Sequence, residues 1–328
     1  MTGGAGFIGS HLVERLLADG HDVLVLDNFS TGRPENLAPF RDDPRLHVND
    51  VDVADWSLVR HAIDGADWVF HLAALADIVP SIQRPLDYHR SNVDGTASTL
   101  EAARAAGSSR FVYAASSSCY GIPDAYPTSE NAELRPEYPY ALTKSIGEQY
   151  VLHWAKVYGL PAVSLRFFNV YGPRARTSGT YGAVFGVFLA QKRAHQPFTV
   201  VGDGEQTRDF TYVTDVVDAC VHAARSEVAG RVYNVGSGRA TSINRLVELL
   251  GDEAGVVNVP RRPGEPDCTL ADISRIRDEL GWEPRVSIEE GVALLLEDID
   301  AWSDAPVWNA RAIEDATADW FRYLSPRA

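Results

Sequence analysis

Several residue types that would define a class of protein are scarce in this sequence. Its 328 residues include three cysteines, Cys119, Cys220 and Cys268, which lie far apart. Cysteines this few and odd in number predict neither a disulfide framework nor a zinc site, and they favour a reducing compartment, so we expect a cytoplasmic protein. The nine histidines form no cluster at ligand spacing, and we therefore predict no metal site.

Positive charge is also scarce, because 30 lysines and arginines face 45 aspartates and glutamates. The formal net charge of −15 repels nucleic acid and anionic membrane surfaces. No apolar run approaches the roughly 18–20 residues that a membrane span needs, and we find no signal-peptide pattern. We therefore expect a globular protein with no nucleic acid and no membrane partner, in which local arginines bind any anionic substrate.

The sequence does contain a regular alternation of apolar runs and amphipathic segments. Runs rich in β-branched residues predict buried strands at 21–27, 67–74, 110–116 and 161–167, with helical patterns between them. This alternation predicts an α/β fold built on a Rossmann-type, doubly wound parallel sheet.

The second half of the chain is less regular. It predicts a strand leading into a helix at 210–225, short helices near 242–250 and 271–280, and a glycine- and proline-broken loop at 171–182. We predict a nucleotide-binding Rossmann domain over residues 1–165, to which 211–235 returns. A smaller, interleaved α/β substrate domain is predicted over 166–328, with a helical tail from about residue 301.

A glycine-rich loop opens the chain, where TGGAGFIG leads directly into a helical pattern. Gly3, Gly6 and Gly9 would let the backbone approach a pyrophosphate, which the helix N-terminus also attracts. A tight strand–helix turn without a ligand is the alternative. Asp27, at the end of the next predicted strand, favours the first interpretation, because its carboxylate can accept hydrogen bonds from both ribose hydroxyls. It would also repel a 2′-phosphate, so we predict NAD rather than NADP.

The strand that should precede this loop is almost absent from the sequence. In a doubly wound sheet the first strand is central, and losing about ten hydrogen bonds at about 1 kcal/mol each would match the stability of an ordinary domain. We therefore expect the native chain to start several residues upstream, with Met1 at a position usually held by a strand valine.

Tyr140 and Lys144, in YPYALTK, lie one helical turn apart and so share a helix face. Lys144 can then bind a nicotinamide ribose and, with the oxidised ring, lower the pKa of Tyr140 toward neutrality. A solvated helix face is the alternative. The serine-rich strand end at 114–121 supports the catalytic interpretation, since Ser116 can share a hydrogen bond with the hydroxyl that Tyr140 deprotonates.

Together these stretches resemble the extended short-chain dehydrogenase/reductase family of nucleotide-sugar epimerases and dehydratases. The motifs that carry the resemblance, in order over about residues 1–298, are TGGAGFIG, HLAA, SSSCYG, YALTK, RFFNVYGPR, GDGEQTRDF and RPGEPD. The resemblance implies an NAD that is reduced and reoxidised in each turnover, a nucleotide-diphosphate sugar substrate and a homodimer. It also implies that Tyr140 is the base, that Lys144 lowers the pKa of Tyr140, and that Ser116 is the third catalytic residue.

The resemblance further implies two sets of binding residues. The cofactor set is Gly3, Gly6, Phe7, Ile8, Gly9, Asp27, Asn28, Ser30, Asp52, Val53, Ala73, Ala74, Asn92, Tyr140 and Lys144. The substrate set is Ser117, Ser118, Asn169, Val184, Phe188, Arg208, Arg262 and Thr269. Within the substrate set, Arg208 and Arg262 would bind the diphosphate bidentately. Core packing for Val184 and Phe188, and a surface ion pair for Arg262, remain open.

The residues after Ser116 bear on the reaction. Dehydratases of the family carry an Asp-Glu pair there and decarboxylases a glutamate, whereas Ser117 and Ser118 cannot act as general acid or base near neutral pH. We therefore expect epimerisation at carbon 4 of a UDP-hexose or UDP-N-acetylhexosamine. A small residue at Thr269 leaves room for an N-acetyl group, and Ala76 stands where some 4-epimerases have a lysine.

Two functions other than epimerisation remain open. One alternative function is a dehydratase or reductase that uses an acid not recognised in the sequence. The other is a non-catalytic regulator that binds NAD.

The tail places apolar side chains on one helical face at Ile313, Ala316, Trp320, Phe321 and Leu324. That face is predicted to cover its own subunit or, alternatively, to contact a second one.

Overall fold

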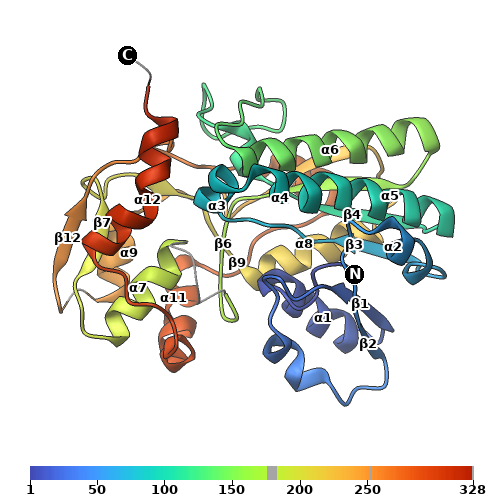
Figure 1. The fold of residues 1–328 in the computed structure, drawn as a ribbon, viewed down its shortest axis with the longest axis horizontal. Helices are drawn as coiled ribbons and strands as arrows, with labels where there is room; N and C mark the ends of the chain where they lie inside the picture. The colour runs from blue at the N-terminus through green and yellow to red at the C-terminus, as the bar shows by residue number, and fades with distance from the viewer. Residues whose placement is uncertain (176–182, 252, 327–328) are drawn as a thin grey trace.

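A computed structural model describes residues 1–175, 183–251 and 253–326 of the protein. Its core is a parallel sheet (Figure 1). Its strands are β1 (Val23–Asp27), β2 (Leu46–Asp50), β3 (Trp68–His71), β4 (Arg110–Ser116), β5 (Ala162–Phe167) and β10 (Arg231–Val235). β2 pairs with β1, and β3, β4, β5 and β10 follow one another in that order, every pair being parallel. The predicted doubly wound α/β fold is therefore confirmed.

Residues 1–3 connect the two parts of this sheet. Thr2 forms parallel bridges to Leu26 in β1 and to His71 in β3. The Met1 amine donates to the Leu24 carbonyl at 2.6 Å, and burial lowers the pKa of that amine to about 5. The segment thus joins β1 to β3 at the carboxyl ends of the strands, where the glycine loop begins. An upstream start of the native chain stays a prediction.

Helices cover both faces of the sheet. One face is covered by α1 (Phe7–Ala18) and α8 (Val213–Arg225). The other is covered by α2 (Trp56–Ala62), α5 (Gly95–Ala106) and α6 (Pro139–Tyr158). Each layer has its own apolar core, because strands buried on both faces project side chains alternately into the two layers. α3 (Ile78–Gln83) and α4 (Pro85–His89) link β3 to α5 through a π-helical turn, Arg90–Asp94.

A second group of elements forms a smaller lobe with a separate core (Figure 1). Its strands are β6 (Asn169–Tyr171), β7 (Phe198–Val201), β8 (Thr207–Arg208), β9 (Phe210–Tyr212), β11 (Thr241–Ser242) and β12 (Val256–Val259). They pair two by two, β6 with β9 and β7 with β12 in parallel, and β8 with β11 antiparallel. Its helices are α7 (Val184–Arg193), α9 (Ile243–Leu250), α11 (Ile288–Glu297) and α12 (Ala310–Leu324).

The chain crosses between the two lobes more than once. β10 returns to the edge of the main sheet beside β5, and α10 (Ser274–Leu280) packs on it. The predicted domain boundaries remain predictions, and the predicted loop at 171–182 lies outside the described residues from 176 onward. No helix in the described ranges combines the length and apolarity needed to cross a bilayer.

Candidate active site

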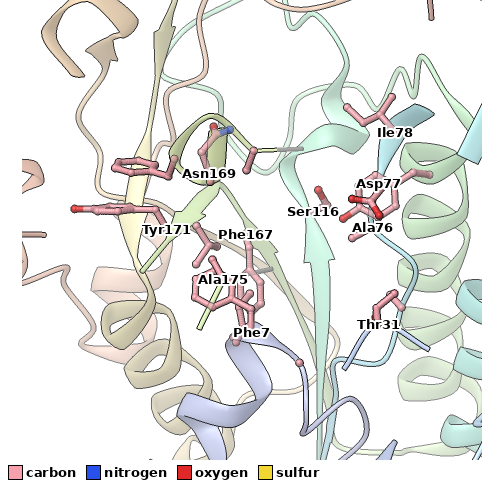
Figure 2. Close-up of a pocket in the computed structure, with 18 of the residues that line it drawn as sticks. Phe7, Thr31, Ala76, Asp77, Ile78, Ser116, Phe167, Asn169, Tyr171 and Ala175 are labelled. Atoms are coloured by element: carbon pink, nitrogen blue, oxygen red, sulfur yellow. The ribbon is translucent and has the colours of Figure 1, made fainter. Parts of the chain in front are cut away.

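A cavity of about 660 Å³ lies between the two lobes, at the carboxyl ends of the parallel strands. Its walls combine the glycine loop, the ends of β1, β3, β4 and β5, the start of α6, and α7. Figure 2 shows Ser116 and Asp77 on one side of it, facing Asn169 and Tyr171 on the other. This position and volume are typical of ligand sites in doubly wound folds.

The glycine loop approaches the neighbouring backbone closely. Gly3 has a φ of +70°, and a Cβ atom there would lie 2.6 Å from the Ala73 amide nitrogen. A Cβ on Gly9 would lie 2.1 Å from the Gly3 carbonyl oxygen, so only glycine fits at this crossing. The N-terminus of α1 at Phe7 has no side-chain cap among the described residues and opens onto the cavity. Its backbone N–H groups therefore fit a pyrophosphate.

Asp27 lies at the end of β1 beside this helix. Its side chain is buried, and its two oxygens accept backbone hydrogen bonds from Ala5 and Phe29, each at 2.9 Å. Burial raises the pKa of Asp27, while these two N–H groups oppose the rise. Gly32 packs against the carboxylate, with room for no Cβ. Because a carboxylate oxygen accepts more than one hydrogen bond, Asp27 fits a ribose diol.

The remaining predicted cofactor residues fall into two groups. Most of them line the cavity, namely Gly3, Gly6, Phe7, Ile8, Gly9, Asn28, Ser30, Asp52, Val53, Ala73 and Ala74. Asn92 does not line it: its amide group instead brackets Leu75, accepting from the backbone nitrogen at 2.8 Å and donating to the carbonyl at 2.9 Å. Asn92 therefore holds the segment after β3 that carries Ala73 and Ala74.

Tyr140 and Ser116 meet in the cavity wall. Ser116 ends β4 and Tyr140 lies in the first turn of α6, and both residues line the cavity. The pKa of Tyr140 is raised to about 12, mainly by burial and to a lesser extent by the nearby Cys119 and Asp77, while hydrogen bonding to Ser116 opposes this rise. Tyr140 is therefore protonated near neutral pH in this environment, and a base at this position needs added positive charge.

Lys144 lies one turn further along α6 and is buried beneath the cavity wall. Its Nζ donates to the Ala114 carbonyl at 2.7 Å and lies 4.9 Å from the centre of the Tyr113 ring. Burial lowers the pKa of Lys144 to about 8. The Lys144 amine is thus mostly protonated at pH 7, and this pH is close to the one at which the amine loses its proton.

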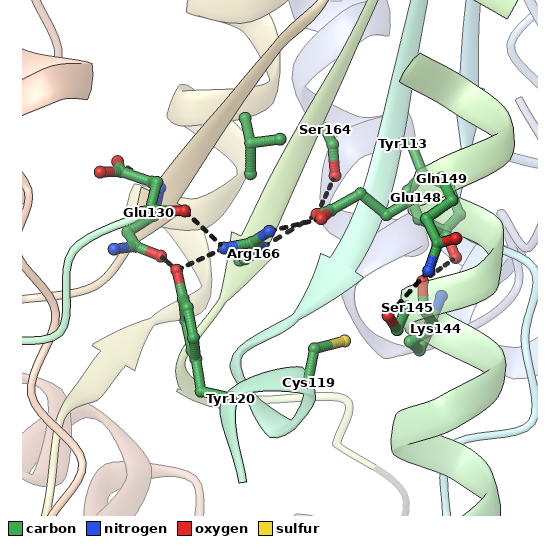
Figure 3. Close-up of polar contacts among 12 residues, drawn as sticks. Tyr113, Cys119, Tyr120, Glu130, Lys144, Ser145, Glu148, Gln149, Ser164 and Arg166 are labelled. Atoms are coloured by element: carbon green, nitrogen blue, oxygen red, sulfur yellow. Dashed lines mark hydrogen bonds and ion pairs between the residues drawn. The ribbon is translucent and has the colours of Figure 1, made fainter. Parts of the chain in front are cut away.

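A buried polar network anchors α6 to the sheet (Figure 3). Glu148 on α6 accepts hydrogen bonds from Ser164 at 2.8 Å and, at both carboxylate oxygens, from the Arg166 guanidinium on β5. Arg166 also donates to the Tyr120 hydroxyl at 2.8 Å. Since Glu148 lies one turn after Lys144, this ion pair fixes the helix that carries both Tyr140 and Lys144.

Two predicted diphosphate ligands, Arg208 and Arg262, converge in the opposite wall. Arg208 donates to Glu265 at 2.8 Å, and Arg262 lies 3.8 Å from the other oxygen of the same carboxylate. Both arginine side chains are largely buried. One carboxylate between two guanidiniums leaves a net positive charge, and a guanidinium has five N–H donors, so this pair fits an anionic group.

The other predicted substrate residues are not all in the cavity wall. Asn169, Val184 and Phe188 line the cavity. Thr269 is not among the described lining residues: its hydroxyl donates to Asn169 at 2.9 Å and accepts from the Asp209 amide at 3.0 Å. The Thr269 hydroxyl therefore supports the Asn169 side chain from behind, and the room for an N-acetyl group remains a prediction.

Ser117 and Ser118 are likewise not among the described residues that line the cavity. They begin a short 3₁₀ turn, and the Ser118 hydroxyl lies 2.8 Å from that of Ser116. Their position is therefore behind Ser116, where Ser118 can orient the Ser116 hydroxyl.

The cavity wall also contains residues that sequence reasoning did not assign to the site, among them Asp77, Glu265, Trp308 and Trp320. Asp77 follows the HLAA motif and Glu265 lies within RPGEPD, so both had a local signal. Trp320 was assigned to a packing face of the tail. Its place in the cavity depends on how α12 folds back, which the helical spacing alone does not reveal.

Comparisons with known proteins agree with this geometry. A family model described as the NAD dependent epimerase/dehydratase family matches residues 1–236. A UDP-glucose 4-epimerase of Mycolicibacterium smegmatis is 39% identical over 303 residues, which cover 90% of this chain and 96% of the relative.

Two solved structures of enzymes with different activities show the same fold. A UDP-N-acetylglucosamine 4-epimerase from Methanobrevibacter ruminantium M1, in complex with UDP-N-acetylmuramic acid, has a TM-score of 0.86 and 34% identity, covering 92% of this chain and 96% of its own. A dTDP-glucose 4,6-dehydratase from Streptomyces venezuelae with NAD bound has a TM-score of 0.85 and 30% identity, covering 92% and 98%.

Proposed function

The chain belongs to the NAD-dependent epimerase/dehydratase family, and we propose that it inverts carbon 4 of a UDP-hexose or UDP-N-acetylhexosamine through a transient 4-keto sugar. The observation that carries this proposal is the pairing of Tyr140 with Ser116 in the cavity wall, with Lys144 buried below. The hydroxyls of Ser117 and Ser118 follow, where an eliminating enzyme needs carboxylates.

We assign NAD to the part of the cavity between the glycine loop and Tyr140. The N-terminus of α1 would hold the pyrophosphate, Asp27 the adenosine ribose, and Lys144 the nicotinamide ribose. When bound, NAD would accept a hydride from carbon 4 of the sugar and later return it to the same carbon.

The chain's own residues would move the proton. Tyr140, as the phenolate, takes the proton of the 4-hydroxyl while Ser116 hydrogen-bonds the same oxygen. After the keto sugar has turned its other face, Tyr140 returns this proton to the carbonyl oxygen, so the sugar ends with inverted configuration and no net redox change. For Tyr140 to act as a base, the charge of Lys144 and the Ser116 hydrogen bond must counter the burial that raises its pKa.

The opposite wall supports a nucleotide-diphosphate substrate. Arg208 and Arg262, joined through Glu265, would bind the diphosphate. Val184 and Phe188 on α7 would flank the base. The similarity to a UDP-glucose 4-epimerase and a UDP-N-acetylglucosamine 4-epimerase favours a UDP sugar, either glucose or its N-acetylamino form. A homodimer and a cytoplasmic location remain predictions.

A dehydratase is the second candidate, and Asp77 is the residue that bears on it. Dehydration needs an acid–base pair near carbons 5 and 6, and Asp77 is a carboxylate in the wall close to Tyr140. One such group does not replace the missing pair after Ser116, so we favour epimerisation. A non-catalytic regulator is disfavoured because Tyr140, Ser116 and Lys144 are all in place.

A Tyr140→Phe variant tests the proposal. We expect it to keep its bound NAD and to lose conversion of UDP-glucose to UDP-galactose by about a thousandfold or more, within the range for removing a positioned general base. A variant that retains wild-type turnover would refute the assignment of Tyr140. Unchanged NAD content, measured after denaturation, is the control for an intact fold.

A further inference from the structure

The C-terminal helix α12 folds back onto the active site. Its buried side chains Ile313, Thr317 and Trp320 face the protein, and the helix packs against α3, which starts directly after Asp77 in the cavity wall (Figure 1). Gln83 at the end of α3 donates to Asp319 at 2.9 Å. The tail thus covers its own subunit at the cavity.

Trp320 reaches the cavity from this helix. Its indole N–H donates to the Pro263 carbonyl at 2.7 Å, which fixes the orientation of the ring. The ring centre lies 5.4 Å from the Arg262 guanidinium carbon and 6.2 Å from the Tyr138 ring, which in turn stacks on Tyr140 at 6.5 Å. Trp320 therefore lies against the arginine at one end of the proposed substrate, and the Tyr138 ring connects it to the tyrosine at the other end.

In a nucleotide-diphosphate sugar the hexose lies between the diphosphate and the hydroxyl that reacts. If Arg262 binds the diphosphate and Tyr140 meets the 4-hydroxyl, the hexose ring lies along the wall that Trp320 forms. The indole N–H is already occupied by Pro263, so the ring offers the hexose an apolar surface rather than a hydrogen bond. The C–H groups of a hexose form an apolar patch that packs against such a surface.

We propose that Trp320 is a substrate-binding residue, which the C-terminal helix supplies as an aromatic wall for the hexose. This inference rests on the proposed function. A wall without hydrogen bonds suits an epimerase, because a 4-keto sugar must present both faces in turn and a fixed polar contact would favour one of them. The wall also keeps water from the hexose, as a closed reaction site requires.

Titration calorimetry with UDP and UDP-glucose tests the inference, using NAD-loaded wild type, Trp320→Ala and Trp320→Phe. Tyr323→Ala is the matched control, since Tyr323 lies on the same helix and is half exposed. We expect Trp320→Ala to weaken UDP-glucose binding by about tenfold and to change UDP binding less than twofold. Trp320→Phe should recover most of the lost affinity, and Tyr323→Ala should match wild type.

Two results would overturn the inference while wild type still binds UDP-glucose. In the first, Trp320→Ala binds UDP-glucose as wild type does. In the second, it loses UDP and UDP-glucose affinity equally, as expected if Trp320 acts only through Arg262 or the fold. Wild-type protein that binds neither ligand would instead refute the proposed function itself.

Discussion

Removing Glu148 should destabilise the protein strongly, because it would leave a buried guanidinium without its counter-charge. Glu148 and Arg166 have 2% and 4% of their surface exposed. Breaking such a pair from one side costs about 3–5 kcal/mol. An ordinary domain has a free energy of unfolding of about 5–15 kcal/mol, so Glu148→Ala would remove a large fraction of it.

The exposed pair Glu101–Arg104 provides the control. Its side chains are 34% and 41% exposed, and such pairs contribute about 1 kcal/mol or less. Urea denaturation followed by circular dichroism would compare Glu148→Ala with Glu101→Ala. The double variant Glu148→Met/Arg166→Met should recover most of the loss, since it leaves no unpaired charge.

A Glu148→Ala variant that is no less stable than Glu101→Ala would contradict this prediction. A double methionine variant that is less stable than Glu148→Ala would also contradict it, because the cost would then not come from an unpaired charge. Since α6 carries Tyr140 and Lys144, we also expect Glu148→Ala to lower turnover under conditions where it remains folded.

Two further predictions concern the pH profile and the cofactor. In the wild type, Ser116 lowers the pKa of Tyr140, so Ser116→Ala should raise that pKa and move the acidic limb of the kcat/KM profile to higher pH. Asp77 raises the same pKa, so Asp77→Asn should move the limb to lower pH. Limbs that stay in place in both variants would contradict Tyr140 as the titrating base. Asp27→Ala should weaken NAD binding by about ten- to hundredfold, measured by calorimetry on NAD-free protein, since it removes hydrogen bonds to a charged acceptor. Equal affinity in Asp27→Ala and wild type would refute its assignment to the ribose.

The sequence predicted the buried strands of the sheet well because burial on both faces leaves an apolar run. The run at 110–116 coincides with β4, and the run at 161–167 with β5. β2 gave no such signal, since four of its five side chains are exposed at the edge of the sheet. The run at 67–74 extends past the end of β3 because Ala73 and Ala74 are apolar as part of the cavity wall.

Site residues within short motifs could be predicted, whereas those that depend on tertiary folding could not. Tyr140 and Lys144 lie on one helix face, so spacing alone places them together. Glu265 joins Arg208 only when β8 meets the segment after β12. Trp320 enters the cavity only because α12 folds back over α3.

The most direct test of the proposed function is proton NMR of the purified protein incubated with UDP-glucose and UDP-N-acetylglucosamine labelled with deuterium at carbon 4. In unlabelled parallel samples, we predict a product whose small coupling between protons 3 and 4 reports inversion at carbon 4. The deuterium should remain at carbon 4, because the hydride leaves and returns at the same carbon. A keto or deoxy product, or deuterium at carbon 6, would contradict epimerisation and favour dehydration.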